Sequence, residues 1–141
     1  MAYFTIPGKA LACVSTSRQL YDFLTDFKNF GSILPEDKAE NFSFSETSCS
    51  FNIRGITPMT VILKNKVPFS LIEFSSEGLG KFNFDLKVVF EGLADENGTS
   101  QITLSGDLNP FIKAMAEKPL TALVDSMNKK LSELKIQEHA D

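Results

Sequence analysis

The chain has 141 residues, of which 43% are hydrophobic and 23% charged, and its formal net charge is −4. This length lies near the usual size of one domain, ~100–150 residues, and buries enough surface to fold without a metal ion or a disulfide. We therefore expect one domain over residues 1–141. The acidic balance argues against nucleic acid as a partner, because phosphate binding needs a basic face.

The N-terminal region does not resemble a signal peptide. Its longest apolar run, residues 10–14, is shorter than the ~7–15 apolar residues of a signal-peptide core. No stretch approaches the ~20 apolar residues of a membrane span. We expect a cytoplasmic protein without a membrane span. Cys13 and Cys49 are expected to be small buried thiols, the alternative being a disulfide if their backbones approach within about 7 Å.

The first elements are a strand and two short helices. Residues 3–14 alternate loosely and predict a strand that is interrupted at Pro7-Gly8. Thr16 followed by Gln19 is a capping-box pattern and predicts the start of a helix. Asp26 is placed to cap a second short helix.

Alternating apolar and polar residues predict six antiparallel strands between residues 39 and 108. The clearest is the stretch 81–90, which puts five apolar residues on one face: Phe82, Phe84, Leu86, Val88 and Phe90. Its other face is polar, so we expect a sheet with one wet and one dry side. Asn97-Gly98 predicts a tight turn before the last strand.

Glu73 has two possible orientations. It continues the parity of Phe69 and Leu71, which would make it a buried acid and a weak candidate for a catalytic proton donor. The alternative is a phase switch at Leu71-Ile72, after which Ile72 and Phe74 face inward. The pattern favours the switch, because bulges are common in strongly curved sheets.

A long helix is predicted at the C-terminal end of the chain. Asn109 is a good N-cap, and Pro110 suits the first helical position. Apolar residues then recur at helical spacing from Phe111 onward. Pro119 lies inside this pattern and predicts a kink, because proline lacks the amide hydrogen.

This order of elements resembles the helix-grip fold of the SRPBCC superfamily, which includes START-related lipid carriers, birch-pollen-allergen-like proteins and polyketide cyclase/dehydratase proteins. The residues that carry the likeness are Ser15–Ser17 before Leu20–Phe27, and the helix from Asn109 through Pro119 to Leu131. The resemblance implies an α+β fold, in which a curved seven-stranded antiparallel sheet grips the long kinked C-terminal helix. In such proteins a cavity between sheet and helix commonly binds sterols, lipids, hormones or polyketides.

The inward apolar residues therefore predict either a packed core or a ligand cavity. Phenylalanine occurs 13 times and tryptophan is absent, which gives the interior large side chains. The candidate ligand-binding residues are Phe27, Phe30, Phe51, Ile53, Val61, Phe69, Phe84, Leu86, Phe90, Leu104, Phe111, Met115, Leu123 and Met127.

The leading hypothesis is non-catalytic binding or transport of a hydrophobic or amphipathic small molecule, lipid-like or polyketide-like, by a monomer or homodimer. We expect no cofactor and no metal site. His139 is the one histidine, and the two cysteines lack a C-x-x-C spacing.

Two other hypotheses stay open. One is a cyclase/dehydratase-type enzyme, which requires an inward Glu73 or another buried acid. The other is a protein-interaction module like the START-related co-chaperone domains. It requires an exposed apolar patch, for which Phe27, Phe30, Ile33 and Leu34 are the candidates.

Overall fold

The computed structural model describes residues 2–37, 39–53, 58–78, 83–93, 95–108 and 110–136. The predicted positions Phe82, Asn109 and His139 lie outside these residues. In chain order the elements are β1 (Ala2–Pro7), β2 (Leu11–Ala12), α1 (Ser17–Leu24), α2 (Phe27–Phe30), a short 3-10 helix η1 (Gly31–Ile33), β3 (Ala39–Phe44), β4 (Ser48–Ile53), β5 (Pro58–Val67), β6 (Leu71–Gly78), β7 (Asn83–Glu91), β8 (Thr99–Leu108) and α3 (Pro110–Glu133).

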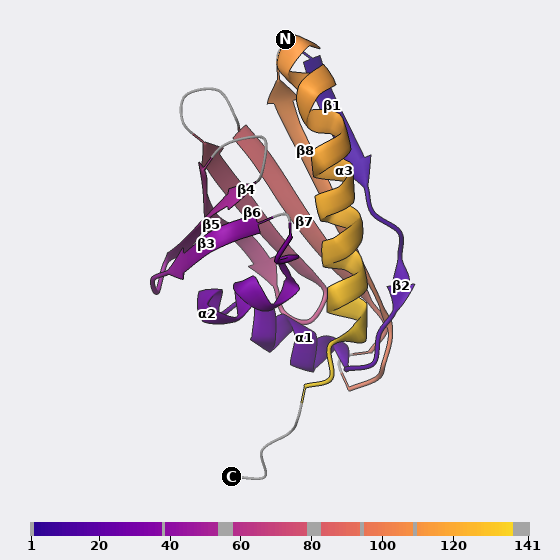
Figure 1. The fold of residues 1–141 in the computed structure, drawn as a ribbon. Helices are drawn as coiled ribbons and strands as arrows, with labels where there is room; N and C mark the ends of the chain where they lie inside the picture. The colour runs from indigo at the N-terminus through magenta and orange to yellow at the C-terminus, as the bar shows by residue number, and fades with distance from the viewer. Residues whose placement is uncertain are drawn as a thin grey trace.

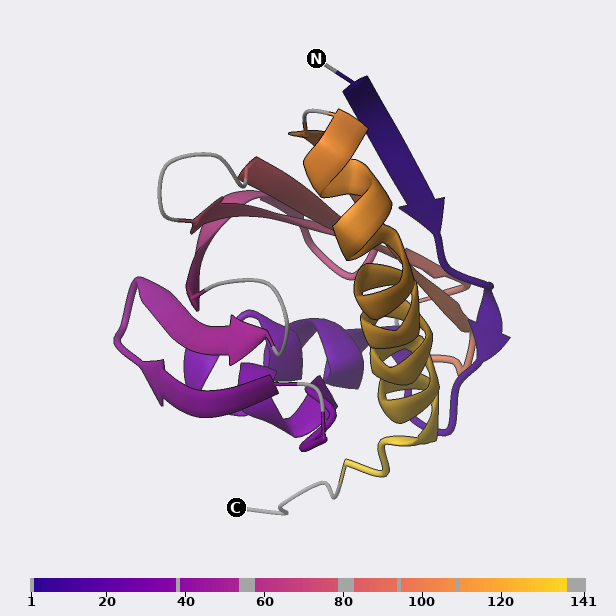
Figure 2. The ribbon, with the colours of Figure 1, turned by 45° about the horizontal axis from the view of Figure 1, so that its top comes forward.

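The strands form one antiparallel sheet in the order β1-β8-β7-β6-β5-β4-β3, and β2 also pairs with β8. β1 and β2 are two segments of one N-terminal strand, broken at the predicted Pro7-Gly8 interruption. Counted in this way, the predicted seven-stranded sheet is confirmed. The sheet curves so that β3 and β4 come round toward α1 and α2, while α3 lies across the concave side (Figures 1 and 2).

Local side-chain bonds fix where the short helices begin. The Thr16 hydroxyl accepts from the Gln19 backbone amide at 3.1 Å, and the Gln19 side chain accepts from the Thr16 amide at 2.9 Å. This is the predicted capping box. Asp26 caps α2 by accepting from the Lys28 amide at 3.1 Å. Together α1 and α2 close one end of the space between sheet and α3 (Figure 1).

The α3 helix runs for 24 residues and contains Pro119, which confirms the predicted long C-terminal helix. Proline has no amide hydrogen, so the carbonyl of Met115 receives no helical hydrogen bond from position 119. The second half of α3 packs against the sheet through Leu120, Leu123 and Met127, all of which are buried.

The parity of β6 gives Glu73 the outward orientation that the pattern favoured. Ile72 and Phe74 are 0% and 1% exposed, whereas Glu73 lies on the opposite face and accepts a hydrogen bond from the Asn65 side chain at 3.2 Å. No switch occurs at Leu71-Ile72, because Leu71 pairs with the exposed Val67 and both lie on the outer face with Glu73. The irregularity lies in β5, where the pairing with β6 shifts between Leu63 and Asn65.

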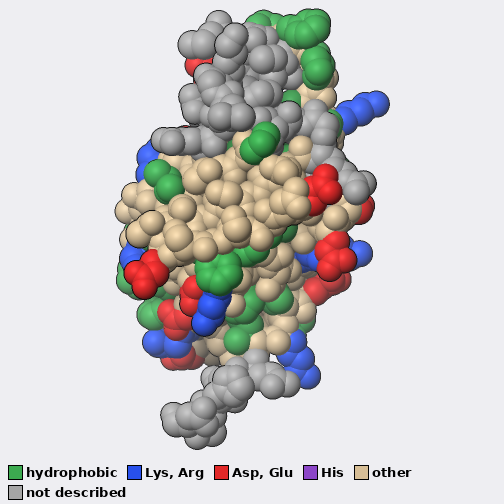
Figure 3. All heavy atoms as spheres, turned by 60° about the vertical axis from the view of Figure 1, so that its left-hand side comes forward, with side chains coloured by type: hydrophobic (Ala, Val, Ile, Leu, Met, Phe, Trp, Pro, Cys, Tyr) green, Lys and Arg blue, Asp and Glu red, His purple; other side chains and the backbone are tan. Residues whose placement is uncertain are grey.

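The residues of the predicted interaction patch lie inside the protein. Phe27, Phe30, Ile33 and Leu34 are all buried, so the prediction of an exposed patch over these residues is wrong. Phe27 and Phe30 are three residues apart and share the face of α2 that packs against Phe74 of the sheet. Figure 3 views the molecule from the side on which β3–β5 lie in Figure 1. It shows a broad area of uncharged polar side chains and backbone, with most charges at its margin. Among the described helices, none is long and apolar enough to cross a membrane.

A candidate apolar binding site between the sheet and the C-terminal helix

The candidate site is a small pocket between the concave side of the sheet and the second half of α3. Its lining comes from five neighbouring strands and the helix: Phe51, Ile53, Met59, Val61, Ser76, Phe84, Leu86, Leu104, Leu123 and Met127. The cavity has a volume of about 10 Å³. Pockets that hold drug-sized ligands measure roughly 300–1,000 Å³, and one water molecule needs about 10–15 Å³. The interior is therefore almost completely filled in this conformation.

Eight of the predicted ligand-binding residues lie together around this pocket. They are Phe51, Ile53, Val61, Phe84, Leu86, Leu104, Leu123 and Met127. Strand alternation identified the six sheet residues, because every second side chain of a half-buried strand faces the same side.

Other predicted residues fill the interior instead of lining the pocket. The rings of Phe27 and Phe30 pack edge-to-face against Phe74, with centroids 6.0 Å and 5.2 Å away. Phe30 also stacks on Phe51 at 6.2 Å. This aromatic cluster fills the space between α2 and the sheet. It closes one end of the pocket. Phe90 is buried but does not line the pocket.

Phe69 belongs to a separate contact at the β5–β6 turn. Its ring packs edge-to-face on Tyr21 at 5.4 Å, and the Arg18 guanidinium lies 4.4 Å from the ring centroid. Arg18 also donates to Asp95 at 2.8 Å. These contacts join α1 to two turns of the sheet, so Phe69 is placed outside the pocket.

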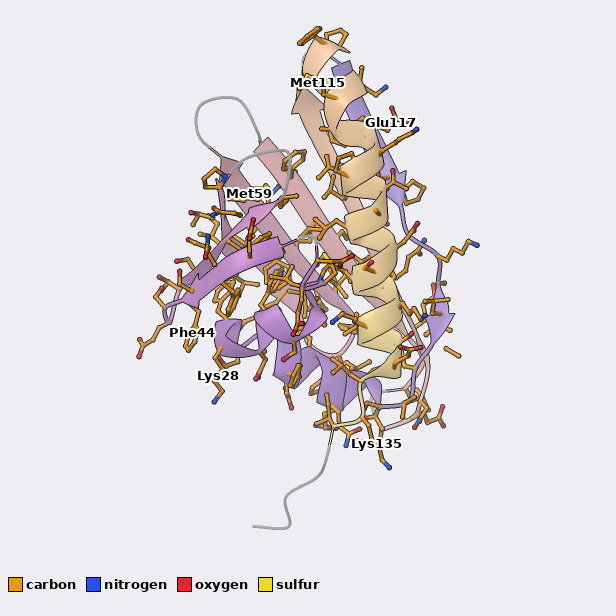
Figure 4. All side chains as sticks on the ribbon, in the orientation of Figure 1. Lys28, Phe44, Met59, Met115, Glu117 and Lys135 are labelled. Carbon is orange, nitrogen blue, oxygen red and sulfur yellow. The ribbon has the colours of Figure 1, made fainter. Side chains whose placement is uncertain are left out.

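Phe111 and Met115 are 76% and 63% exposed, so the structure places these two predicted lining residues outside the pocket. Figure 4 shows Met115 near the start of α3, and Met59 on the sheet. The physical reason is that the apolar residues of α3 occupy two faces of the helix. Positions 111 and 115 share one face, whereas the buried positions 116, 120, 123 and 127 share another.

Two lining residues, Met59 and Ser76, were missed by the sequence analysis of ligand-binding positions. Met59 has the same parity as Val61, so strand alternation contained the signal for it. Ser76 follows Ile72 and Phe74 at the same parity. A small polar residue at an inward position gives no hydrophobic signal, which is why the pattern overlooked it.

The lining offers no group for acid–base chemistry. Ser76 is its one polar side chain, and its hydroxyl donates to the Phe84 carbonyl at 3.1 Å. Among the side chains whose burial the structure describes, no aspartate or glutamate is buried. The described residues also contain no group of three side chains that is suited to hold a metal ion.

Cys49 lies on the inward face of β4 but does not line the pocket. Burial raises the pKa of its thiol to about 12. A nucleophilic cysteine reacts as the thiolate, and burial disfavours this form of Cys49 at neutral pH. Cys13 is also a free buried thiol, and burial raises its pKa as well.

The architecture is shared with solved structures of low sequence identity. A START superfamily protein from Mycobacterium smegmatis is 10% identical and superposes with a TM-score of 0.60, covering 92% of this chain and 96% of that one. The chain has the START-like helix-grip fold. An aromatase/cyclase from Streptomyces is 12% identical with a TM-score of 0.64, covering 92% and 94%. Norcoclaurine synthase from Thalictrum flavum is 11% identical with a TM-score of 0.65, covering 92% and 94%. No family model and no curated protein matches the sequence.

The two halves of α3 differ in how many of their side chains are buried. In residues 110–119, Ala116 is the one described side chain that is buried. The second half buries Leu120, Leu123, Val124, Met127, Asn128, Leu131 and Ser132. Its end is also tied to the N-terminal segment, where the Val14 amide donates to the Ser132 carbonyl at 2.9 Å. The first half of α3, which contributes no residue to the pocket lining, is therefore the less constrained part of the helix.

Proposed function

We propose that the protein binds an apolar small molecule between the sheet and α3, without catalysing a reaction on it. The observation that supports this proposal is the composition of the pocket wall, which consists of nine apolar side chains and one serine already hydrogen-bonded to the backbone. Acid–base catalysis needs a titratable side chain within reach of the substrate, and this wall contains none. The enzyme hypothesis that depended on Glu73 loses its support, because Glu73 lies on the other face of the sheet.

Binding requires the pocket to open from its filled volume of about 10 Å³. Two features support such an opening. Met59 and Met127 lie on opposite walls, and methionine adapts to varied shapes through its three rotatable bonds. The first half of α3 is weakly packed and lacks the hydrogen bond that Pro119 cannot donate. Affinity would come from burying apolar ligand surface, at roughly 25 cal/mol per Å² before ordering costs.

The methionines allow a direct test without a substitution. The chain has four methionines, of which Met59 and Met127 line the pocket and Met115 is exposed. The protein is labelled with ¹³C at the methionine methyl groups and titrated with 1-decanol. We expect saturable shifts of the Met59 and Met127 resonances and little change at Met115. Small, unsaturable shifts of equal size at all three would contradict the proposal.

A matched pair of variants separates pocket binding from surface binding. Met127→Trp fills the pocket, whereas Met115→Trp makes the same change at an exposed position of the same helix. The probe is N-phenyl-1-naphthylamine, an uncharged dye that fluoresces when it enters an apolar site. We expect Met127→Trp to lose saturable dye binding and Met115→Trp to retain it. Circular dichroism verifies that both variants are folded.

A further inference from the structure

The chemistry of the pocket wall restricts which apolar molecules it accepts. We infer that the pocket takes a hydrocarbon chain that carries no carbonyl or charged group along its buried part, so that an alkyl chain is preferred over an oxygenated, polyketide-like one. This inference rests on the proposed function and names the ligand class of the same site.

A ligand carbonyl would need a hydrogen-bond donor inside the pocket. The one hydroxyl of the wall belongs to Ser76, and its proton is donated to the Phe84 carbonyl at 3.1 Å. Ser76 is itself buried, so a water molecule cannot readily replace the Phe84 carbonyl as the acceptor of its proton. The remaining lone pairs of the Ser76 oxygen can accept a hydrogen bond but cannot donate one.

The backbone of the pocket wall offers no alternative donor. The lining residues of β4 to β8 are all paired with neighbouring strands of the antiparallel sheet, so their amides are used in the ladders. In the described part of the chain, no buried side-chain nitrogen or oxygen lacks a partner. The Cys49 thiol is a weak donor and lies outside the lining. A carbonyl carried into the pocket would therefore give up its hydrogen bonds to water without replacement.

Charged groups are excluded for the same reason. The lining contains no lysine, arginine, aspartate or glutamate. A carboxylate or phosphate without a partner is far more costly to bury than a carbonyl. A polar or charged end of the ligand would thus stay outside, and the pocket would surround only its hydrocarbon part.

Three molecules with ten carbons and one oxygen test this ligand class: 1-decanol, 5-decanol and 5-decanone. Each is used to displace N-phenyl-1-naphthylamine from the protein. The first can leave its hydroxyl at the mouth, the second can donate to Ser76, and the third has a central carbonyl that finds no donor. We expect the affinity to fall in that order, with 5-decanone weaker than 1-decanol by roughly fivefold or more.

Ser76→Val provides the internal control. It removes the hydroxyl, and its branched side chain covers the Phe84 carbonyl, which would otherwise be free to accept from 5-decanol. The affinities of 5-decanol and 5-decanone should then become equal. If 5-decanone binds as tightly as 1-decanol, the inferred ligand class is wrong while the proposed binding function stands. If the dye binds the protein without saturation and none of the three molecules displaces it, the proposed function fails and the inference with it.

Discussion

The side-chain amide of Asn128 supplies the acceptor that a strand residue would offer to the Ile102 amide. The Ile102 amide donates to Asn128 Oδ1 at 2.7 Å, while the Ile102 carbonyl accepts from Asn128 Nδ2 at 3.1 Å and from the Gly8 amide at 3.0 Å. β1 pairs with β8 as far as Thr103, and β2 resumes the pairing at Ser100, so Ile102 lies at the break between them. A residue of α3 thus completes the hydrogen bonds of β8 and fixes the second half of the helix to the sheet.

Replacing Asn128 with alanine should destabilise the protein by about 2 kcal/mol. The substitution leaves the buried Ile102 amide without an acceptor, and such an orphaned group costs about 1–3 kcal/mol. Urea denaturation measures the change in the free energy of unfolding. The control is Lys129→Ala at the adjacent exposed position, which should change it by less than about 0.5 kcal/mol. Equal stability of the two variants would show that the amide does not replace the strand.

Gly8 makes the close approach at this break possible. A Cβ atom at this position would lie 1.9 Å from Asn128 Nδ2 and 2.3 Å from the Ile102 carbonyl oxygen. Gly8→Ala should therefore destabilise the fold by about 1–3 kcal/mol, the usual cost of overpacking. In Gly31→Ala the added Cβ meets the Phe42 ring at 3.0 Å, and a ring at the edge of the sheet can shift. A smaller loss for Gly31→Ala than for Gly8→Ala in thermal unfolding is the expected result, and the reverse order would refute it.

Local chemistry made much of the fold predictable from the sequence. The Thr16–Gln19 capping box and the alternation in β4 depend on residues that are close in the chain, so the pattern and the structure agree. Phe69 shows where parity fails. It lies in the turn at residues 68–70, where strand alternation does not apply, and a phenylalanine gives no sequence signal of a turn or of a φ of 62°.

The volume of the pocket could not be predicted from the pattern. Alternation identifies which side chains face inward, whereas the space that remains depends on how side chains from different elements interdigitate. The contacts of Phe74 with Phe27 and Phe30 fill one end of the interior, and they join β6 to a helix that is far away in the sequence. The exposure of Phe111 is a related case, because helical spacing alone does not say which face of α3 meets the sheet.

The stability of the protein should fall in alkaline solution partly because of Cys49. Burial raises the pKa of this thiol to about 12 in the folded state, whereas the unfolded chain has an ordinary thiol pKa of about 8.5–9. Below about pH 8 both states are protonated and the contribution of the thiol is constant. Between about pH 9 and 12 only the unfolded state loses the proton, so the free energy of unfolding falls by up to about 1.4 kcal/mol per pH unit.

Cys49→Val isolates this contribution from other groups that titrate at high pH. Valine is apolar, of similar size and suited to a strand. Urea denaturation at pH 8, 9.5 and 10.5 should show a shallower decline for Cys49→Val than for the unchanged protein. Parallel curves for the two proteins would mean that the thiol is not protected from ionisation by the fold.

Pro119→Ala should hold the first half of α3 in place and so weaken ligand binding. Alanine supplies the amide that proline lacks, which restores a helical hydrogen bond to the Met115 carbonyl and removes a cost of up to about 3 kcal/mol. Amide hydrogen exchange in residues 113–118 should slow. If this half must move for the pocket to open, each 1.4 kcal/mol added to the cost of opening weakens the dye affinity about tenfold.

Lys118→Ala is the matched control, because it alters the exposed neighbouring residue without adding a backbone donor. It should leave both hydrogen exchange and the affinity for N-phenyl-1-naphthylamine near those of the unchanged protein. Slower exchange in Pro119→Ala together with unchanged affinity would show that the pocket opens elsewhere. The rearrangement would then involve the side chains of Met59 and Met127, which the labelled methyl groups report separately.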